Sequence, residues 1–268
     1  GVQTCALPIF TFKLNKRVPY EIEEGEIFKL TFYNLKNGED DKYTFEFPYS
    51  LLTESEKIVG YSGKYDGNKF IFKIRKPNKI SNRHPLKNIT VAVDAGHGGN
   101  EYGAIGCLGD KEKDIVLKIA QYLKEELESR GVTVIMTRDS DTYTDLYDRV
   151  KTANENDSEI FISIHANALP DTLNPLTHQG TSVYYYYNQA KALAGNILIS
   201  MNSQLNTKND KVRQESFAVI RNTAAVSVLI ETAYLINPED NAMLIQDEFQ
   251  HNCAKAIADG IEHYITEK

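Results

Sequence analysis

The stretch that most constrains the fold of this 268-residue chain is residues 89–99, ITVAVDAGHGG. β-branched residues occupy every second position from Ile89 to Val93, a spacing that is typical of a buried strand. Asp94 ends this strand, and three glycines surround His97, so the backbone can turn sharply beside the imidazole. α/β proteins place their chemistry at the carboxyl ends of strands. The rest of the chain therefore has to supply partners for His97.

Downstream of this stretch, apolar strand patterns alternate with helical patterns. A helix is predicted between an N-cap at Asp110 and a stop at Gly131. The alternation predicts an α/β fold over residues 88–268, with a mostly parallel sheet flanked by helices. Further strands are predicted at 132–136, 160–164, 182–187, 217–220 and 226–230, and further helices at 143–154, 190–205, 240–246 and 248–265.

The N-terminal part has a different pattern. Residues 10–76 contain short alternating strand patterns separated by turn signals, which predict a small all-β accessory domain. Residues 77–87 are polar, contain two prolines and are expected to form a linker. Residues 1–9 lack a starting Met and the features of a signal peptide, so we interpret them as a non-native leader. A native signal peptide would then be missing from this sequence.

Composition excludes several classes of function. The net charge of −7 and the pI near 5.5 argue against a nucleic-acid partner, and no apolar run is long enough for a membrane span. Cys5, Cys107 and Cys253 are odd in number and widely spaced, so free thiols are expected. No partner protein is evident from the sequence.

Polar residues follow three of the predicted strands. His97, His165 and Glu231 each come directly after a strand or its turn, and Glu112 starts the helix after the first strand. Because parallel strands end at one edge of a sheet, we expect these four side chains to converge. Two imidazoles and a carboxylate are a common ligand set for catalytic zinc, and a second carboxylate can accept a proton from water. Each residue alone also fits a structural role, in a turn, at a sheet edge or at a helix start.

Five motifs, in this order and spacing, resemble the zinc-dependent N-acetylmuramoyl-L-alanine amidases of the Amidase_3 type. The motifs are DAGHGG (94–99), KEK (111–113), TR (137–138), SIHAN (163–167) and LIETAYLIN (229–237), and the resemblance covers about residues 85–265. It implies hydrolysis of the amide between the lactyl group of N-acetylmuramic acid and the L-alanine of the stem peptide. It also implies that His97, Glu112 and His165 hold one Zn²⁺ ion. Glu231 is then the catalytic carboxylate.

Three other residues near the motifs also have expected roles. Asn167 fits substrate binding and loop stabilisation equally well, and Arg138 and Arg149 are expected to pair with carboxylates as structural residues. The sequence VRQESF, residues 212–217, is only loosely similar to the family's segment. Residues 190–205 are expected to form an ordinary covering helix rather than an inhibitory one, which would leave the site open.

The expected function is thus a hydrolase with peptidoglycan as its partner, located outside the cell or in the cell envelope. The β-rich accessory domain matches a habit of such amidases, which use similar domains to target the cell wall. Two alternatives keep the same fold. One is a catalytically inactive peptidoglycan-binding or regulatory protein, and the other is a zinc peptidase or deacetylase that acts on wall fragments.

Overall fold

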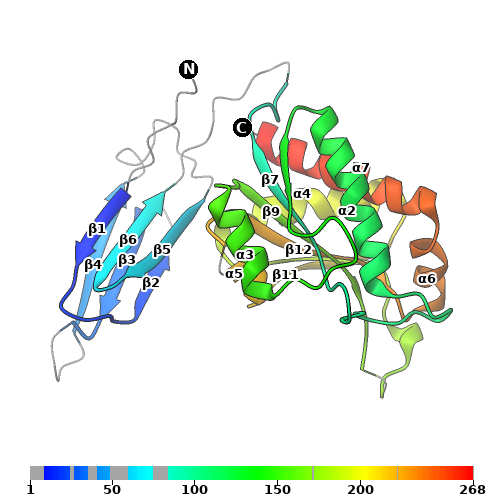
Figure 1. Cartoon of the computed structure of the whole chain (residues 1–268), viewed down its shortest axis with the longest axis horizontal. Helices are drawn as coiled ribbons and strands as arrows, with labels where there is room; N and C mark the ends of the chain where they lie inside the picture. The colour runs from blue at the N-terminus through cyan, green and yellow to red at the C-terminus, as the bar shows by residue number, and fades with distance from the viewer. Residues whose placement is uncertain are drawn as a thin grey trace. The chain divides into compact units, whose positions relative to one another are not determined.

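The computed structural model describes residues 9–24, 27–35, 41–48, 60–74, 84–170, 172–221 and 223–267. By its internal contacts the chain divides into two compact units, Gly1–Lys79 and Ile80–Lys268 (Figure 1). Residues 1–8 of the expected leader, with Cys5, and most of the expected linker lie outside the described residues. Cys107 and Cys253 are free thiols, as expected.

The N-terminal unit consists of two three-stranded antiparallel sheets. Its strands are β1 (Ile9–Lys13), β2 (Tyr20–Glu23), β3 (Ile27–Tyr33), β4 (Lys42–Pro48), β5 (Tyr61–Asp66) and β6 (Lys69–Ile74). The strand orders are β1-β6-β5 and β2-β3-β4. Aromatic rings form the core, with Phe32 and Phe70 fully buried and their centroids 5.0 Å apart. The sequence pattern predicts four of these strands, whereas β2 and β5 are too polar to stand out.

The C-terminal unit is built on a six-stranded mixed sheet. Its strands are β7 (Thr90–Ala95), β8 (Thr133–Met136), β9 (Ile160–Asn167), β10 (Thr181–Tyr185), β11 (Asn209–Gln214) and β12 (Val226–Tyr234). In the order β11-β10-β12-β9-β7-β8, four strands run parallel, and β10 and β11 run the opposite way. The predicted α/β fold, preceded by an all-β region, is confirmed. Because β7, β9 and β12 are parallel neighbours, their carboxyl ends meet at one edge.

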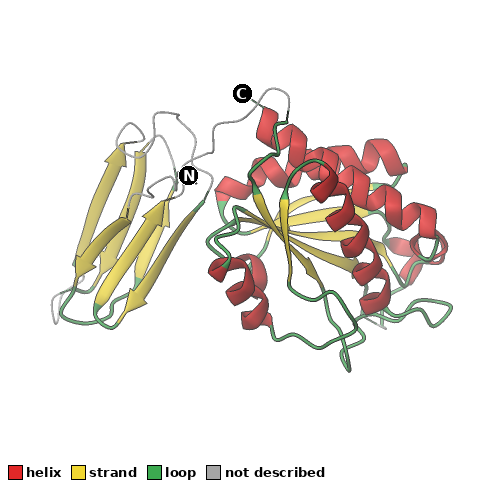
Figure 2. Cartoon of the chain, turned by 45° about the horizontal axis from the view of Figure 1, so that its top comes forward, coloured by secondary structure: helices red, strands yellow, loops and turns green. Residues whose placement is uncertain are grey.

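Helices cover both faces of this sheet (Figure 2). They are α2 (Glu112–Ser129), α3 (Leu146–Glu155), α4 (Lys191–Leu205), α5 (Ala218–Arg221), α6 (Pro238–Leu244) and α7 (Asp247–Thr266), with short 3-10 turns η1 (Pro175–Thr177) and η2 (Asn188–Ala190). α2, α4 and α7 pack over one face, and α3 and α5 pack over the other. Neighbouring strand residues point to opposite faces, so Val93 joins the larger core and Ala92 the smaller one. Across the described part of the chain, no helix combines the length and hydropathy that a membrane span requires.

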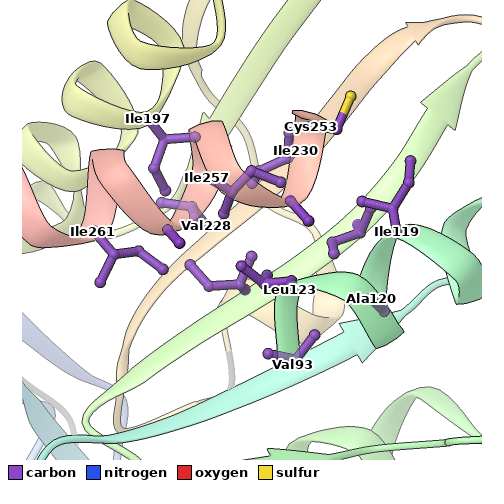
Figure 3. Close-up of a cluster of buried hydrophobic side chains, with 14 of the residues drawn as sticks. Val93, Ile119, Ala120, Leu123, Ile197, Val228, Ile230, Cys253, Ile257 and Ile261 are labelled. Carbon is purple, nitrogen blue, oxygen red and sulfur yellow. The ribbon is translucent and has the colours of Figure 1, made fainter. Parts of the chain in front are cut away.

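α7 is a central helix of the larger core. Cys253, Ile257 and Ile261 recur every four residues and are fully buried, as in a helix with one apolar face. Figure 3 shows these side chains in one cluster with Ile197 of α4. Gly260 lets the two helices approach, because a Cβ atom at this position would lie 2.6 Å from the Cα atom of Ile197.

One predicted strand is wrong. Residues 218–220 of this predicted strand belong to helix α5, where Val219 and Ile220 are both buried, and Phe217 directly precedes the helix. The strand of this region is β11, with the sequence NDKVRQ. It is an edge strand that pairs only with β10 among the described strands, so one of its sides has no partner and its sequence shows no apolar alternation. A short buried apolar run, by contrast, looks the same in a strand and in a helix.

Candidate metal and catalytic site

His97 lies in a tight turn directly after β7. Its φ angle is +59°, in the left-handed region that costs a non-glycine residue about 1–2 kcal/mol, so neighbouring contacts have to hold the turn. The turn also requires Gly96, since a Cβ atom there would lie 2.2 Å from Cε1 of the His165 ring. Gly96 therefore allows the ring of His165 to lie against the turn that carries His97.

The side chain of Glu112 lies between the two imidazoles. Oε2 is 3.2 Å from Nε2 of His97, and Oε1 is 2.9 Å from Nδ1 of His165. The backbone N–H groups of Ala104 and Ala166 donate to Oε2 and Oε1 at 2.8 and 3.1 Å. Burial opposes ionisation of this carboxyl, but the hydrogen bonds with His165 and His97 outweigh it and hold the pKa of Glu112 well below its usual range. Glu112 is therefore a carboxylate at neutral pH.

The start of α2 places Glu112 in this position. The N-cap is Lys111, without a side-chain capping bond, so the prediction of Asp110 as N-cap is wrong by one residue. The preceding loop folds back instead, and the backbone N–H of Glu112 donates to the carbonyl of Ala104 at 2.9 Å. Within this loop Gly103 leaves room for the side chain of Glu112, because a Cβ atom there would lie 2.4 Å from Oε2 of Glu112.

His165 and Glu231 come from the neighbouring strands β9 and β12. In the parallel ladder His165 lies opposite Glu231, and Ser182 of β10 lies opposite Glu231 on the other side. Residues paired across a ladder point to the same face of the sheet. Leu229, two residues before Glu231, belongs to the core under α3 and α5, so the three polar side chains lie on that face.

His97, Glu112 and His165 form one group whose ligand atoms all lie within 4.8 Å of one another. The ring centroids of the two histidines are 4.9 Å apart, and their planes are inclined at 81°. Side-chain exposure is 29% for His97 and 19% for His165 but 6% for Glu112, so the group opens to solvent on its imidazole side. Two imidazole nitrogens and one carboxylate oxygen fit zinc in number and chemistry.

Glu231 lies beside this group and is not part of it. Its Oε2 atom is shielded from solvent and has no hydrogen-bond partner among the described residues. Burial raises the pKa of Glu231 well above its usual range, and the negative charge of Glu112 adds to this. An unpaired carboxyl with a raised pKa beside a set of metal ligands is typical of a general acid or base.

The structure gives the other three predicted residues different surroundings. Asn167 accepts a hydrogen bond from the backbone N–H of Ala168 at 2.8 Å, so its side-chain oxygen is engaged with the loop after β9. Arg149 forms a buried ion pair with Asp94 at 2.8 Å, as expected. Arg138 was expected to pair with a carboxylate, and this is wrong. Among the described residues it donates to four backbone carbonyl oxygens instead.

Sequence reasoning missed Ser182. It is fully buried, and its Oγ atom has no hydrogen-bond partner among the described residues. Its position beside Glu231 follows from the antiparallel pairing of β10 with β12. The sequence TSVYY shows an ordinary strand but not its neighbour, so no local signal could have placed Ser182 at the site.

Two imidazoles and a carboxylate at the edge of an α/β sheet, with a second carboxyl beside them, are typical of metal-dependent hydrolases. A comparison with known families is more specific. The profile of the family described as N-acetylmuramoyl-L-alanine amidase (Amidase_3) matches residues 91–263 of this chain. The chain belongs to this family.

Relatives of the chain agree with this assignment. The probable cell wall amidase LytH of Staphylococcus saprophyticus is 38% identical over 193 residues, which are 71% of this chain and 63% of that protein. The probable cell wall amidase LytH of Staphylococcus aureus is 31% identical over 251 residues, 93% of this chain and 78% of that protein. This chain therefore spans only part of both relatives. Because residues 80–268 are 189 of the 268 residues, an alignment over 93% also includes much of the N-terminal unit.

Solved structures match the C-terminal part of the fold. The N-acetylmuramoyl-L-alanine amidase AmiC2 of Nostoc punctiforme has a TM-score of 0.64 and 37% sequence identity. The match covers 67% of this chain and 98% of that one. The similarity thus spans almost the whole of the solved amidase chain. The matched share of this chain is close in size to the C-terminal unit, Ile80–Lys268.

Proposed function

We propose that this protein is a zinc-dependent hydrolase of peptidoglycan. It cleaves the amide between the lactyl group of N-acetylmuramic acid and the L-alanine of the stem peptide. The observation that carries the proposal is the group of His97, Glu112 and His165, whose ligand atoms lie within 4.8 Å in a chain of the amidase family. In the proposal these three residues hold one Zn²⁺ ion.

The residues of the chain divide the chemistry between them. When bound, zinc lowers the pKa of a water ligand to about 7 and polarises the scissile carbonyl. Glu231 accepts the proton of the attacking water at Oε2, the oxygen that has no other partner, and delivers it to the nitrogen of the leaving L-alanine.

The proposal also assigns roles to the other parts of the chain. Residues 88–268 form the catalytic domain, residues 77–87 a linker, and residues 10–76 an accessory domain that binds the wall. Asn167 is the last residue of β9, the strand that carries His165, and contacts substrate with its side-chain NH2 group, while its side-chain oxygen accepts from Ala168. Peptidoglycan as substrate places the protein outside the cell or in the envelope, in line with relatives that are named cell wall amidases.

Product analysis tests the proposal. The full chain, supplied with zinc, is incubated with purified peptidoglycan, and the new termini are identified by mass spectrometry. The expected products are peptides with a free L-alanine amino end and glycans with an unsubstituted lactyl group. Cleavage within the stem peptide would instead support the zinc peptidase. Tight wall binding without any release would support the inactive binding protein.

Glu231→Gln tests the role of the second carboxyl. The variant is expected to retain one zinc per chain, because Glu231 is outside the ligand group, and to lose activity by about 10² or more. Metal analysis and the rate of product release are the two measurements. Glu239→Gln, at an exposed carboxyl, is the control and should leave both unchanged. Substantial turnover by Glu231→Gln would show that the assigned role is wrong.

A further inference from the structure

Two buried arginines hold the backbone of the turn that carries His97. Arg138 donates to the carbonyl oxygens of Ala95 and Gly96 at 2.9 and 2.8 Å. Arg149 donates to the carbonyls of Ala95 and His97, both at 2.6 Å. Three consecutive carbonyl oxygens therefore accept hydrogen bonds from guanidinium groups. These bonds explain how a non-glycine residue remains in the left-handed region.

Arg138 also reaches the second ligand-bearing segment. The same Nη2 atom that donates to Gly96 donates to the carbonyl of Lys113 at 2.9 Å. Lys113 directly follows Glu112 at the start of α2. One planar guanidinium thus joins the backbone beside His97 to the backbone beside Glu112.

The charge of Arg138 gives the metal site no electrostatic benefit. The side chain is almost completely buried, and burial together with the positive charge of Arg149 lowers the pKa of Arg138. A buried cation behind a metal site also repels the metal. Burying a charge is costly, so the benefit of Arg138 has to lie in its geometry, a rigid fork of donors that lysine does not have.

We propose that Arg138 is a positioning residue that sets the separation of His97 and Glu112 and thereby the metal affinity of their group. This inference rests on the proposed function, because it presupposes that the group binds zinc. Contacts behind metal ligands typically change metal affinity by about 10- to 100-fold when they are removed. We expect a change of this size for Arg138, although it acts through the backbone.

Metal binding by variants of the full chain tests the inference. Arg138→Met removes the fork, and Arg138→Lys keeps the charge. Arg130→Met is the control, because Arg130 is a partly buried arginine outside the ligand group and pairs with Asp259 and Glu262, at 2.7 and 3.0 Å. Zinc affinity is measured by competition with a chromophoric chelator. The visible absorption spectrum of the Co²⁺-substituted protein reports the geometry of the ligands.

Arg138→Met is expected to bind zinc about tenfold or more weakly and to give an altered cobalt spectrum, with partial recovery in Arg138→Lys. Arg130→Met should lower the unfolding temperature and change neither metal readout. Thermal unfolding of the metal-free proteins shows which variants are folded. If Arg138→Met is unfolded, the zinc affinity and cobalt spectrum of Arg138→Lys decide the test.

Wild-type affinity and a wild-type cobalt spectrum in the deciding variant would overturn the inference. So would an equal loss of affinity in Arg130→Met. A wild-type protein that binds no zinc would instead overturn the proposed function, and this inference with it.

Discussion

Gly96 packs against the imidazole of His165, and Gly103 packs against the carboxylate of Glu112. A Cβ atom would lie 2.2 Å from the ring at the first position and 2.4 Å from Oε2 at the second. Both distances are shorter than any ordinary contact of a carbon atom. Glycine is therefore needed at both positions, because any larger residue would collide with a side chain of the ligand group. This requirement is separate from the need for glycine in a sharp turn.

Gly96→Ala should displace the ring of His165 and weaken zinc binding by about tenfold or more, as other changes next to metal ligands do. Chelator competition on the purified variant measures the effect. Gly195→Ala is the control, because a Cβ atom there meets nothing within 4 Å. Equal zinc affinity in Gly96→Ala and wild type would show that the ring position at this group does not matter.

Helices α4 and α7 come into backbone contact at Gly260. A Cβ atom at this position would lie 2.6 Å from Cα and 2.9 Å from N of Ile197. Since protein cores are closely packed, a methyl group here has to push the helices apart. The larger core depends on this contact, because Ile197 and Ile257 belong to the same cluster (Figure 3).

Gly260→Ala should lower the free energy of unfolding by about 1–3 kcal/mol, the usual cost of overpacking. Gly195→Ala in α4 should raise it by about 0.5–1 kcal/mol, because alanine is the better helix former and the position is open. Urea unfolding of the two variants measures both changes. A stabilised Gly260→Ala would contradict the close approach of α4 and α7.

The strands that can be predicted well from sequence are those whose residues are buried on both faces of the sheet. β7, β9 and β12 are apolar because helices cover both faces of the sheet, so their existence, and the polar residues at their ends, can be predicted. β11 is an edge strand with polar sequence, and the short α5 is apolar, so their patterns mislead.

The same limit applies to the site. His97 after β7, Glu112 at the start of α2, and His165 and Glu231 near the carboxyl ends of β9 and β12 follow from the rule that parallel strands end at one edge. The prediction that His165 and Glu231 come directly after their strands is wrong, because β9 continues to Asn167 and β12 to Tyr234. The positions of Ser182 and Arg138 depend on strand order and on contacts between distant segments. A local sequence pattern cannot predict strand order or contacts between distant segments.

The whole chain contains two units with separate cores. The unit Ile80–Lys268 includes all four proposed site residues and a core of its own. A fragment of residues 84–268 is therefore expected to unfold cooperatively and to bind zinc with the affinity of the full chain. Calorimetry and chelator competition check this. An unfolded fragment, or one with weakened zinc binding, would show that the N-terminal unit is part of the folded catalytic unit.

A zinc titration of the chelator-treated full chain, followed by the rate of peptidoglycan hydrolysis, tests the proposed zinc dependence. Activity is expected to be absent without metal, to rise in proportion to added zinc and to saturate at one ion per chain. His165→Ala should lose both the bound ion and the activity. Full activity in the metal-free protein, or a His165→Ala variant that binds zinc and hydrolyses peptidoglycan as the wild type does, would contradict this zinc dependence.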